Sequence, residues 1–190
     1  MEQNAEQIRQ QCIFCQIADG RVNAKKVYED NKFIGVLDIN PANPGHILLI
    51  PKEHISIMPQ MDDELIKKMG MVSKKLSQAL LRALHVQGTT IFEANGSAAG
   101  QRAPHFMIHI IPRLEQDNVG LIPEMKKLND EEIKQVEQAI YEPLKKTLGT
   151  AIKPKEAPKQ ELKKELVQKT SAGQSAINPE LDSISNFLTK

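Results

Sequence analysis

The stretch Pro104-His105-Phe106-Met107-Ile108-His109-Ile110-Ile111-Pro112-Arg113 decides the fold of this chain. In a β-strand, successive side chains lie on opposite faces. The alternation here predicts a strand over 104–112, with His105, Met107 and His109 on one face. The other face would pack Phe106, Ile108 and Ile110 into a core. Two of the five histidines would then share a face, which indicates a polar site along the strand.

Turn signals and hydrophobic periodicity around this stretch predict an α+β domain. The other expected strands, each bounded by a turn, are 26–29, 33–37, 46–50 and 89–93. Apolar residues at steps of three and four, behind Asp62-Asp63-Glu64, predict one long helix over 65–84. A second helix is expected from after Asn129 to about 146, with Pro143 kinking or ending it.

A loop of small residues, Glu93-Ala94-Asn95-Gly96-Ser97-Ala98-Ala99-Gly100-Gln101, precedes the histidine-bearing strand. Small side chains allow backbone N–H groups to approach an anion closely. Such loops often do no more than turn the chain. Beside two histidines, this loop is a candidate phosphate-binding segment.

The cysteines Cys12 and Cys15 form a C-x-x-C motif that by itself fits a metal site, a redox pair or chance. A redox pair is typical of a thioredoxin-like βαβ context, and no such pattern follows. A metal site needs two further ligands, for which His54 and His105 are available. A Cys₂His₂ set is a closed tetrahedral site, so such a metal would be structural.

Composition narrows the function classes. The 190 residues carry a net charge of +1, so we expect neither nucleic acid nor a membrane surface as a partner. No apolar run approaches the roughly 20 residues of a membrane span. The polar start and the small number of cysteines predict no secretory signal and a cytoplasmic location.

The organisation along the chain follows from changes in composition. We expect a flexible N-terminus over 1–11, a folded domain over 12–148, and a charged, proline-containing linker over 149–176. The segment 177–190 fits a short amphipathic helix, since Asn178-Pro179 resembles a helix start. Such a helix is a candidate docking segment for a protein partner, or else a frayed terminus.

Four segments together resemble the histidine triad (HIT) superfamily, and within it the Hint-type nucleotide-binding branch: CIFCQIADG, VLDINPANPGHILLIPKEHI, NGSAAGQ and PHFMIHIIPR. The resemblance implies an α+β antiparallel sheet domain with one long helix, paired as a homodimer. It also implies an activity. In this family the middle His of a His-φ-His-φ-His-φ-φ strand attacks the α-phosphorus of a purine nucleoside phosphate.

The resemblance assigns roles to individual residues. Asp38 would hold the ribose hydroxyls, Ile39 would lie at the base pocket, and His46 would support the triad from a neighbouring strand. His105 and His109 match the outer members of the triad. The residues expected at the phosphate are Asn95, Gly100, Gln101 and Arg102.

Three positions depart from the family pattern. Met107 stands at the place of the nucleophile, Ala94 where the family has Asn, and Arg102 where it has Ser. A thioether is a poor nucleophile towards phosphorus, so Met107 cannot perform the covalent step. Arg102 can still hold a phosphate through charge-assisted hydrogen bonds. His109 then keeps only a supporting role.

Relatives that share the CIFC start bind zinc, and the resemblance implies the same here. The zinc ligands would be Cys12, Cys15, His54 and His105. Such a closed site would stabilise the fold and take no part in the reaction.

Two functions remain open from the sequence. The first is a nucleotide-binding HIT protein whose phosphoramidate or nucleotidyl hydrolase activity is lost or reduced. The alternative is an active hydrolase or nucleotidyl transferase with different chemistry, for example with His109 as general base on water. A third hypothesis is a copper site at Met107, His109 and His46, against which Met107 simply fills vacated space.

Overall fold

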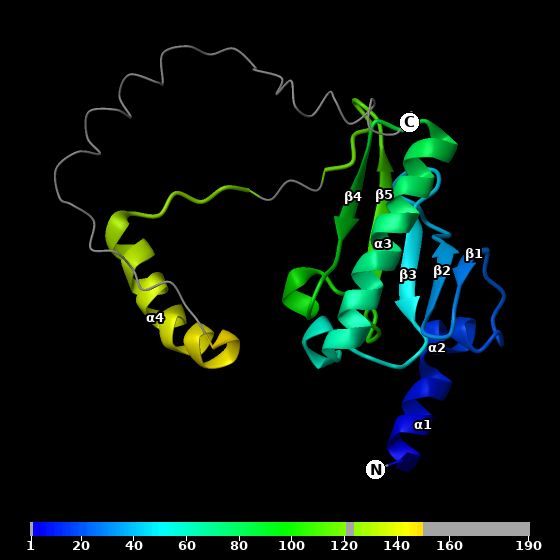
Figure 1. Cartoon of the computed structure of the whole chain (residues 1–190), viewed down its shortest axis with the longest axis horizontal. Helices are drawn as coiled ribbons and strands as arrows, with labels where there is room; N and C mark the ends of the chain where they lie inside the picture. Colours follow the sequence, from blue (N-terminus) through cyan, green and yellow to red (C-terminus); the bar gives the residue numbers. More distant parts are fainter. Residues whose placement is uncertain (1, 121–123, 150–190) are drawn as a thin grey trace. The chain divides into compact units, whose positions relative to one another are not determined.

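The computed structural model describes residues 2–120 and 124–149 of the chain (Figure 1). Its elements are α1 (Glu2–Gln11), α2 (Ile13–Ala18), β1 (Lys26–Glu29), β2 (Phe33–Leu37), β3 (Ile47–Pro51), η1 (Met58–Gln60), α3 (Asp63–Leu84), β4 (Gly88–Phe92), η2 (Ser97–Ala99), β5 (Ile108–Arg113) and α4 (Asp130–Leu148). One compact unit ends at Gly120, and α4 belongs to a second unit. The predicted linker beyond Gly149 and the predicted helix over 177–190 lie outside the described residues.

The first unit is built on a five-stranded antiparallel sheet in the order β1-β2-β3-β5-β4. Strand β3 is central and buried along its whole length, and it pairs with β5 through Leu48 opposite His109. The long helix α3 lies across one face of this sheet (Figure 1). The predicted α+β class, with an antiparallel sheet and one long helix, is confirmed.

Helix α3 begins where its sequence predicts. The Asp62 carboxylate accepts a hydrogen bond from the backbone N–H of Leu65 at 2.7 Å, which caps the first turn. Its apolar stripe faces one core cluster, whose other members include Phe33, Leu49, Phe106 and Ile110. Burying one such side chain contributes about 1.5–3 kcal/mol to the free energy of unfolding. The contact between α3 and the sheet therefore contributes strongly to the stability of this unit.

The opposite face of the sheet carries a smaller cluster. Ala18 of α2 packs there with residues of β2 and β3, and Phe14, Ile17 and Met107 lie at its edge. Helix α2 is short, so it covers only part of this face. The uncovered part is where the cavity described below lies.

Three strands differ from their predicted bounds, and one of them, β4, covers Gly88–Phe92 instead of 89–93. Strand β5 begins at Ile108 rather than at residue 104, because the Phe106 N–H donates to Ile55 instead of to a neighbouring strand. Strand β3 begins at Ile47 and includes Pro51, which pairs with Phe33. The predicted facing still holds, since Phe106, Ile108 and Ile110 pack into the core beneath α3.

Two helical segments also differ from expectation. Residues 2–11, predicted to be flexible, form helix α1. Helix α4 continues through Pro143 to Leu148, so this proline does not end the helix. The domain bounds 12–148 stay a prediction, and among the described residues one compact unit reaches Gly120 while α4 lies in another.

Candidate functional site

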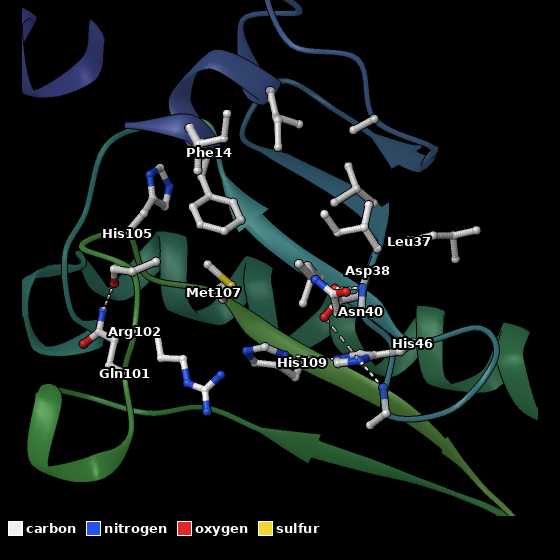
Figure 2. Close-up of a pocket in the computed structure, with 18 of the residues that line it drawn as sticks. Phe14, Leu37, Asp38, Asn40, His46, Gln101, Arg102, His105, Met107 and His109 are labelled. Atoms are coloured by element: carbon white, nitrogen blue, oxygen red, sulfur yellow. Dashed lines mark hydrogen bonds and ion pairs between the residues drawn. The ribbon is translucent and has the colours of Figure 1, made fainter. Parts of the chain in front are cut away.

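A cavity of about 750 Å³ lies on the sheet face opposite α3 (Figure 2). One part is apolar and is lined by Ile13, Phe14, Ile17, Val36 and Leu48. The other part is polar and is lined by Asp38, His46, Arg102 and His109. This volume and this division between an apolar and a polar part are typical of a small-molecule site.

Two histidines form the floor of the polar part. His46 precedes β3 and His109 lies on β5, and the pairing of these strands brings their rings together. The Nε2 atom of His46 lies 3.0 Å from Nδ1 of His109. Burial lowers the pKa of His46, although the neighbouring Asp38 opposes this shift. Burial, reinforced by His46, also lowers the pKa of His109, so both rings are neutral near pH 7.

The hydrogen bonds fix which ring atoms carry protons. The Ala42 N–H donates to Nδ1 of His46 at 3.2 Å, so the neutral His46 ring is protonated on Nε2. That Nε2–H donates to Nδ1 of His109, which must then be protonated on its own Nε2. His109 therefore carries a hydrogen-bond donor at the end of this relay. A neutral ring in this tautomer cannot act as a general base through Nε2.

Asp38 lies where β2 ends, on the opposite side of the polar part from Arg102. Its Oδ1 accepts from the Asn40 N–H at 2.9 Å, and its Oδ2 lies 3.5 Å from Nδ1 of His46. The carboxylate is thus held in place with acceptor capacity towards the cavity. Ile39 lines the rim of the cavity and is 91% exposed.

The small-residue loop contributes to the site differently from the prediction. Gln101 lines the cavity and braces the loop, since its Oε1 accepts from Gly96 N–H and its Nε2 donates to the Ser56 carbonyl, each at 2.7 Å. Gly100 lines the cavity in the left-handed conformation, at φ 89°, which a side chain would strain. Asn95 does not line it, because its Oδ1 accepts from the Met58 N–H at 2.8 Å.

Met107 and Arg102 occupy the middle of the site. Figure 2 shows the Met107 thioether between Phe14 and His109, and the Arg102 side chain extending towards His109. His105, predicted on the same strand face, borders the cavity but directs its Nδ1 to the cysteines instead. Of the three alternating residues, Met107 and His109 therefore belong to the cavity, whereas the Nδ1 atom of His105 belongs to a cluster with the cysteines.

The second site is a cluster of two cysteines and two histidines. The Sγ of Cys12 lies 3.4 Å from Nδ1 of His105, and the Sγ of Cys15 lies 3.2 Å from Nδ1 of His54 and 3.5 Å from Nδ1 of His105. All four candidate ligand atoms lie within 4.8 Å of one another. In a tetrahedral zinc site, sulfur and nitrogen ligands are separated by about 3.5 Å. The cluster therefore fits a tetrahedral Cys₂His₂ metal site.

The surroundings of this cluster favour metal binding. His105 Nε2 lies 3.0 Å from the Pro51 carbonyl oxygen and donates to it, which leaves Nδ1 as an acceptor towards the sulfurs. Burial lowers the pKa of His105 to about 4, so this ring is neutral, as a metal ligand must be. The Cys15 thiol opposes this preference, because burial, together with Cys12, raises its pKa to about 12 and a bound metal would have to displace its proton.

Two structural supports of the site were not predicted from the sequence. Cys12 is the N-cap residue of helix α2 and Cys15 lies in its first turn, and Phe14, between them, lines the cavity. Arg9 of α1 donates to the Lys52 carbonyl at 3.3 Å and to Asp19 at 2.8 Å. The C-x-x-C spacing was a signal for the helical turn, whereas nothing in the sequence pairs Arg9 with Lys52.

A further group of possible metal ligands, Asp38, His46 and His109, lies in the cavity itself. Both ring nitrogens of His46 and the Nδ1 of His109 already take part in hydrogen bonds. A copper ion here would have to break the relay, so the hydrogen bonding disfavours the copper hypothesis.

None of the helices among the described residues combines the length and the apolarity needed to cross a membrane.

Comparison with known proteins identifies the family. The HIT domain matches residues 19–116 of the chain. An uncharacterised HIT-like protein of Methanocaldococcus jannaschii is 42% identical over 128 residues, which are 66% of this chain and 98% of that protein.

Two solved structures share the fold. A zinc-bound histidine triad family protein of Mycobacterium smegmatis has 31% identity and a TM-score of 0.57, over 73% of this chain and 99% of that one. A histidine triad nucleotide-binding protein from Candida albicans has 27% identity and a TM-score of 0.64, over 72% of this chain and 99% of that one. With more than half of its 190 residues matched by the HIT domain, this chain belongs to the HIT domain family.

Proposed function

We propose that this chain is a purine nucleotide-binding protein of the Hint-like branch whose phosphoramidate or nucleotidyl hydrolase activity is lost or reduced. The observation that carries the proposal is Met107, which lies beside an intact His46–His109 relay inside the cavity. A thioether has no proton to exchange and attacks phosphorus poorly. We interpret Met107 as the residue at the nucleophile position of the triad.

The division of the cavity supports a nucleotide as the ligand. The apolar part, between Phe14 and Leu48, suits a planar base, which gains from burial against apolar side chains. Asp38 lies at the junction of the two parts and can accept from ribose hydroxyls. The polar part would then receive the phosphate. We assign to the phosphate the residues Gly100, Gln101, Arg102 and His109. Asn95 is not assigned to it, because its side-chain oxygen accepts a hydrogen bond from the Met58 N–H.

The relay supports binding more than catalysis. In its neutral tautomer, His109 offers an Nε2–H that can donate to a phosphate oxygen. The alternative function, in which His109 removes a proton from water, would need the opposite tautomer. That tautomer would break the hydrogen bond to His46 or the one from Ala42 N–H to His46.

We also propose that Cys12, Cys15, His54 and His105 hold one structural zinc ion. Their ligand atoms are suitably spaced, and two of the four residues, the N-cap residue Cys12 and Cys15, lie at the start of α2. Zinc would link α2 to the segments that follow β3 and precede β5. It would leave no open coordination position, so it would supply stability and no reaction step.

A homodimer completes the proposal. Strand β4 is an edge strand, and its Ile91 and Phe92 are 52% and 38% exposed. Exposed apolar edge strands tend to pair with another chain. Light scattering on the purified protein at several concentrations would give the mass of a dimer, and a strictly monomeric mass would contradict this part.

One experiment tests the main proposal. Isothermal titration with adenosine 5′-monophosphate (AMP) should show binding in the micromolar-to-millimolar range, while an adenosine phosphoramidate is hydrolysed at the background rate. Rapid hydrolysis would favour the alternative, an active HIT hydrolase or nucleotidyl transferase with different chemistry. Absence of nucleotide binding would reduce the family relationship to the fold alone.

A further inference from the structure

Arg102 is the one lysine or arginine among the described residues that line the cavity. The other charged side chain there is Asp38, whose carboxylate is held by Asn40 N–H at 2.9 Å and lies 3.5 Å from His46. The histidines of the polar part are neutral because burial lowers their pKa values. Any positive charge that the cavity offers to a ligand therefore comes from Arg102.

This charge is not used within the fold. Arg102 makes no ion pair and no side-chain hydrogen bond with any of the described residues. Figure 2 shows its side chain reaching across the polar part towards His109. Arg9, Arg21 and Arg113 of this unit form ion pairs with Asp19 or Asp117, whereas Arg82, which has no such partner among the described residues, does not line the cavity. The contrast indicates that Arg102 is available to a ligand.

The groups around Arg102 are donors. His109 presents its Nε2–H, as the direction of the relay from Ala42 requires. Met107 offers neither a strong donor nor a strong acceptor. A ligand group that satisfies this end of the cavity must therefore be an acceptor on several atoms and must carry negative charge.

We propose that Arg102 makes this site selective for a terminal, doubly charged phosphate, and hence for nucleoside 5′-monophosphates over singly charged phosphodiesters or phosphoramidates. The guanidinium fork can hold two phosphate oxygens while His109 donates to the third. A substituent on phosphorus removes one charge and one of these acceptors. This inference rests on the proposed nucleotide function and deepens it, because it names the ligand class and the residue that selects it.

The test compares three probes by isothermal titration at pH 7.5: adenosine, AMP, and the methyl ester of AMP, which carries one negative charge. The unmodified protein should bind AMP about tenfold more tightly than the methyl ester, the effect of about one charge-assisted hydrogen bond. Replacement R102Q should remove this preference and leave the affinity for adenosine unchanged. R102K should keep part of the preference, because it retains the charge and loses the fork.

The matched control is R82Q, which changes an exposed arginine of α3 that does not line the cavity. This variant should keep the tenfold preference. A preference that survives in R102Q, or one that is absent from the unmodified protein although adenosine binds, would overturn this inference and leave the proposed function standing. If neither adenosine nor AMP binds, the proposed function fails and this inference fails with it.

Phosphorus NMR provides a second measurement that needs no variant. The second pKa of a phosphate monoester is about 6. A site that prefers the dianion lowers this pKa in the complex, so the chemical shift of bound AMP should titrate at a lower pH than that of free AMP. In R102Q the two titrations should coincide more closely, and an unshifted titration in the unmodified protein would contradict the inference.

Discussion

At the scale of single residues, Met107 is the position that decides between binding and catalysis. Met107→His should bring hydrolysis of an adenosine phosphoramidate above background, because His46 and His109 already form a relay beside it. Recovery should be partial, since Ala94 and Arg102, which stand where the family pattern has Asn and Ser, line the same cavity. They would stabilise the charge of the transition state less well than the family residues. Turnover by purified variant and unmodified protein, measured side by side, checks this.

Met107→Leu is the control for this prediction. Leucine preserves the volume and the apolar contact of Met107, so nucleotide binding should persist with no gain in turnover. An equal gain in both variants would indicate that looser packing, and not the new imidazole, produced the activity. No gain in Met107→His would mean that more than the nucleophile is missing from the site.

The buried relay predicts a pH dependence of stability. The pKa values of His46 and His109 are lowered in the folded chain, so the unfolded chain takes up protons first as the pH falls below about 6.5. The stabilisation is fully present above that pH and is lost as the pH falls towards the lowered values, by at most about 1.4 kcal/mol per pH unit for each histidine. Urea unfolding at pH 7.5 and 5.5 measures the loss.

Two asparagine variants separate this effect from other titrating groups. His109→Asn should reduce the difference in unfolding free energy between the two pH values. His85→Asn changes an exposed residue that caps α3 in the left-handed conformation, which asparagine tolerates, and should leave the difference unchanged. Equal pH dependence in all three proteins would show that the relay does not carry it.

The residues of the candidate site were partly accessible from the sequence. Alternation along 104–113 predicted that His109 faces away from the core, and the structure brings it to His46. The same alternation could not show that His105 turns to the cysteines, because that depends on where the strand pairing stops. Asn95 was expected at the phosphate, yet local bonding to Met58 uses its side chain.

At the scale of elements, the sequence predicted α3 and most of the strands closely, because α3 buries one continuous stripe and turn residues bound the strands. The predicted strand was longer than β5, because an alternating pattern shows which face each side chain takes and does not show whether a neighbouring strand pairs with it. Residues Ile108 to Ile110 pair with β3, and the residues before them do not. Helix α2 has only 6 residues, too few for a periodic signal, and went unassigned.

Helix α2 connects the metal cluster to the cavity. Phe14 lies between the two cysteines, lines the cavity, and has its ring 6.1 Å from that of His105. Chelation of the proposed zinc should therefore lower Tm by about 10 °C or more, because metal binding energy contributes directly to folding. It should also weaken AMP binding, because the wall that Phe14 forms is no longer fixed. Calorimetry and titration with and without chelator check both effects.

Cys12→Ser provides the internal control. This variant should have a lower Tm than the unmodified protein, and chelator should produce little further change in it. A chelator effect of equal size in both proteins would place the relevant metal elsewhere. A metal-free preparation of the unmodified protein with unchanged Tm would contradict the structural role of the cluster.

At the scale of the whole molecule, the sequence predicted the fold class, and the domain bounds 12–148 stay a prediction. The amphipathic pattern after Asn129 identifies a helix, and the structure contains α4 with an Asn129–Glu132 capping box. Periodicity does not reveal which surface a helix packs on. The expected domain over 12–148 therefore covers α4, which groups with a second compact unit, whereas the first unit reaches Gly120.

The end of the first unit is fastened by a local network that periodicity cannot detect. Arg113, the last residue of β5, donates to Asp117 at 2.7 and 2.9 Å and to the Val119 carbonyl at 2.9 Å. Asn43 donates to the same carboxylate and to the Pro112 carbonyl, each at 2.8 Å. These bonds tie residues 113–119 to the loop before β3, close to His46.

This network makes Gly120 a natural boundary and leads to the last prediction. A chain ending at Gly120 should unfold cooperatively with nearly the same Tm as the full chain and should bind AMP with nearly unchanged affinity. Both core clusters, the cavity and the Cys₂His₂ cluster lie within residues 2–120. A chain ending at residue 149 separates the contribution of α4 from that of the residues beyond it. Asp117→Asn in the shortened chain should lower Tm, because Arg113 and Asn43 lose a charged acceptor. If the chain ending at Gly120 binds AMP more weakly than the chain ending at residue 149, residues 121–149 contribute to the site. That result would contradict the boundary drawn here.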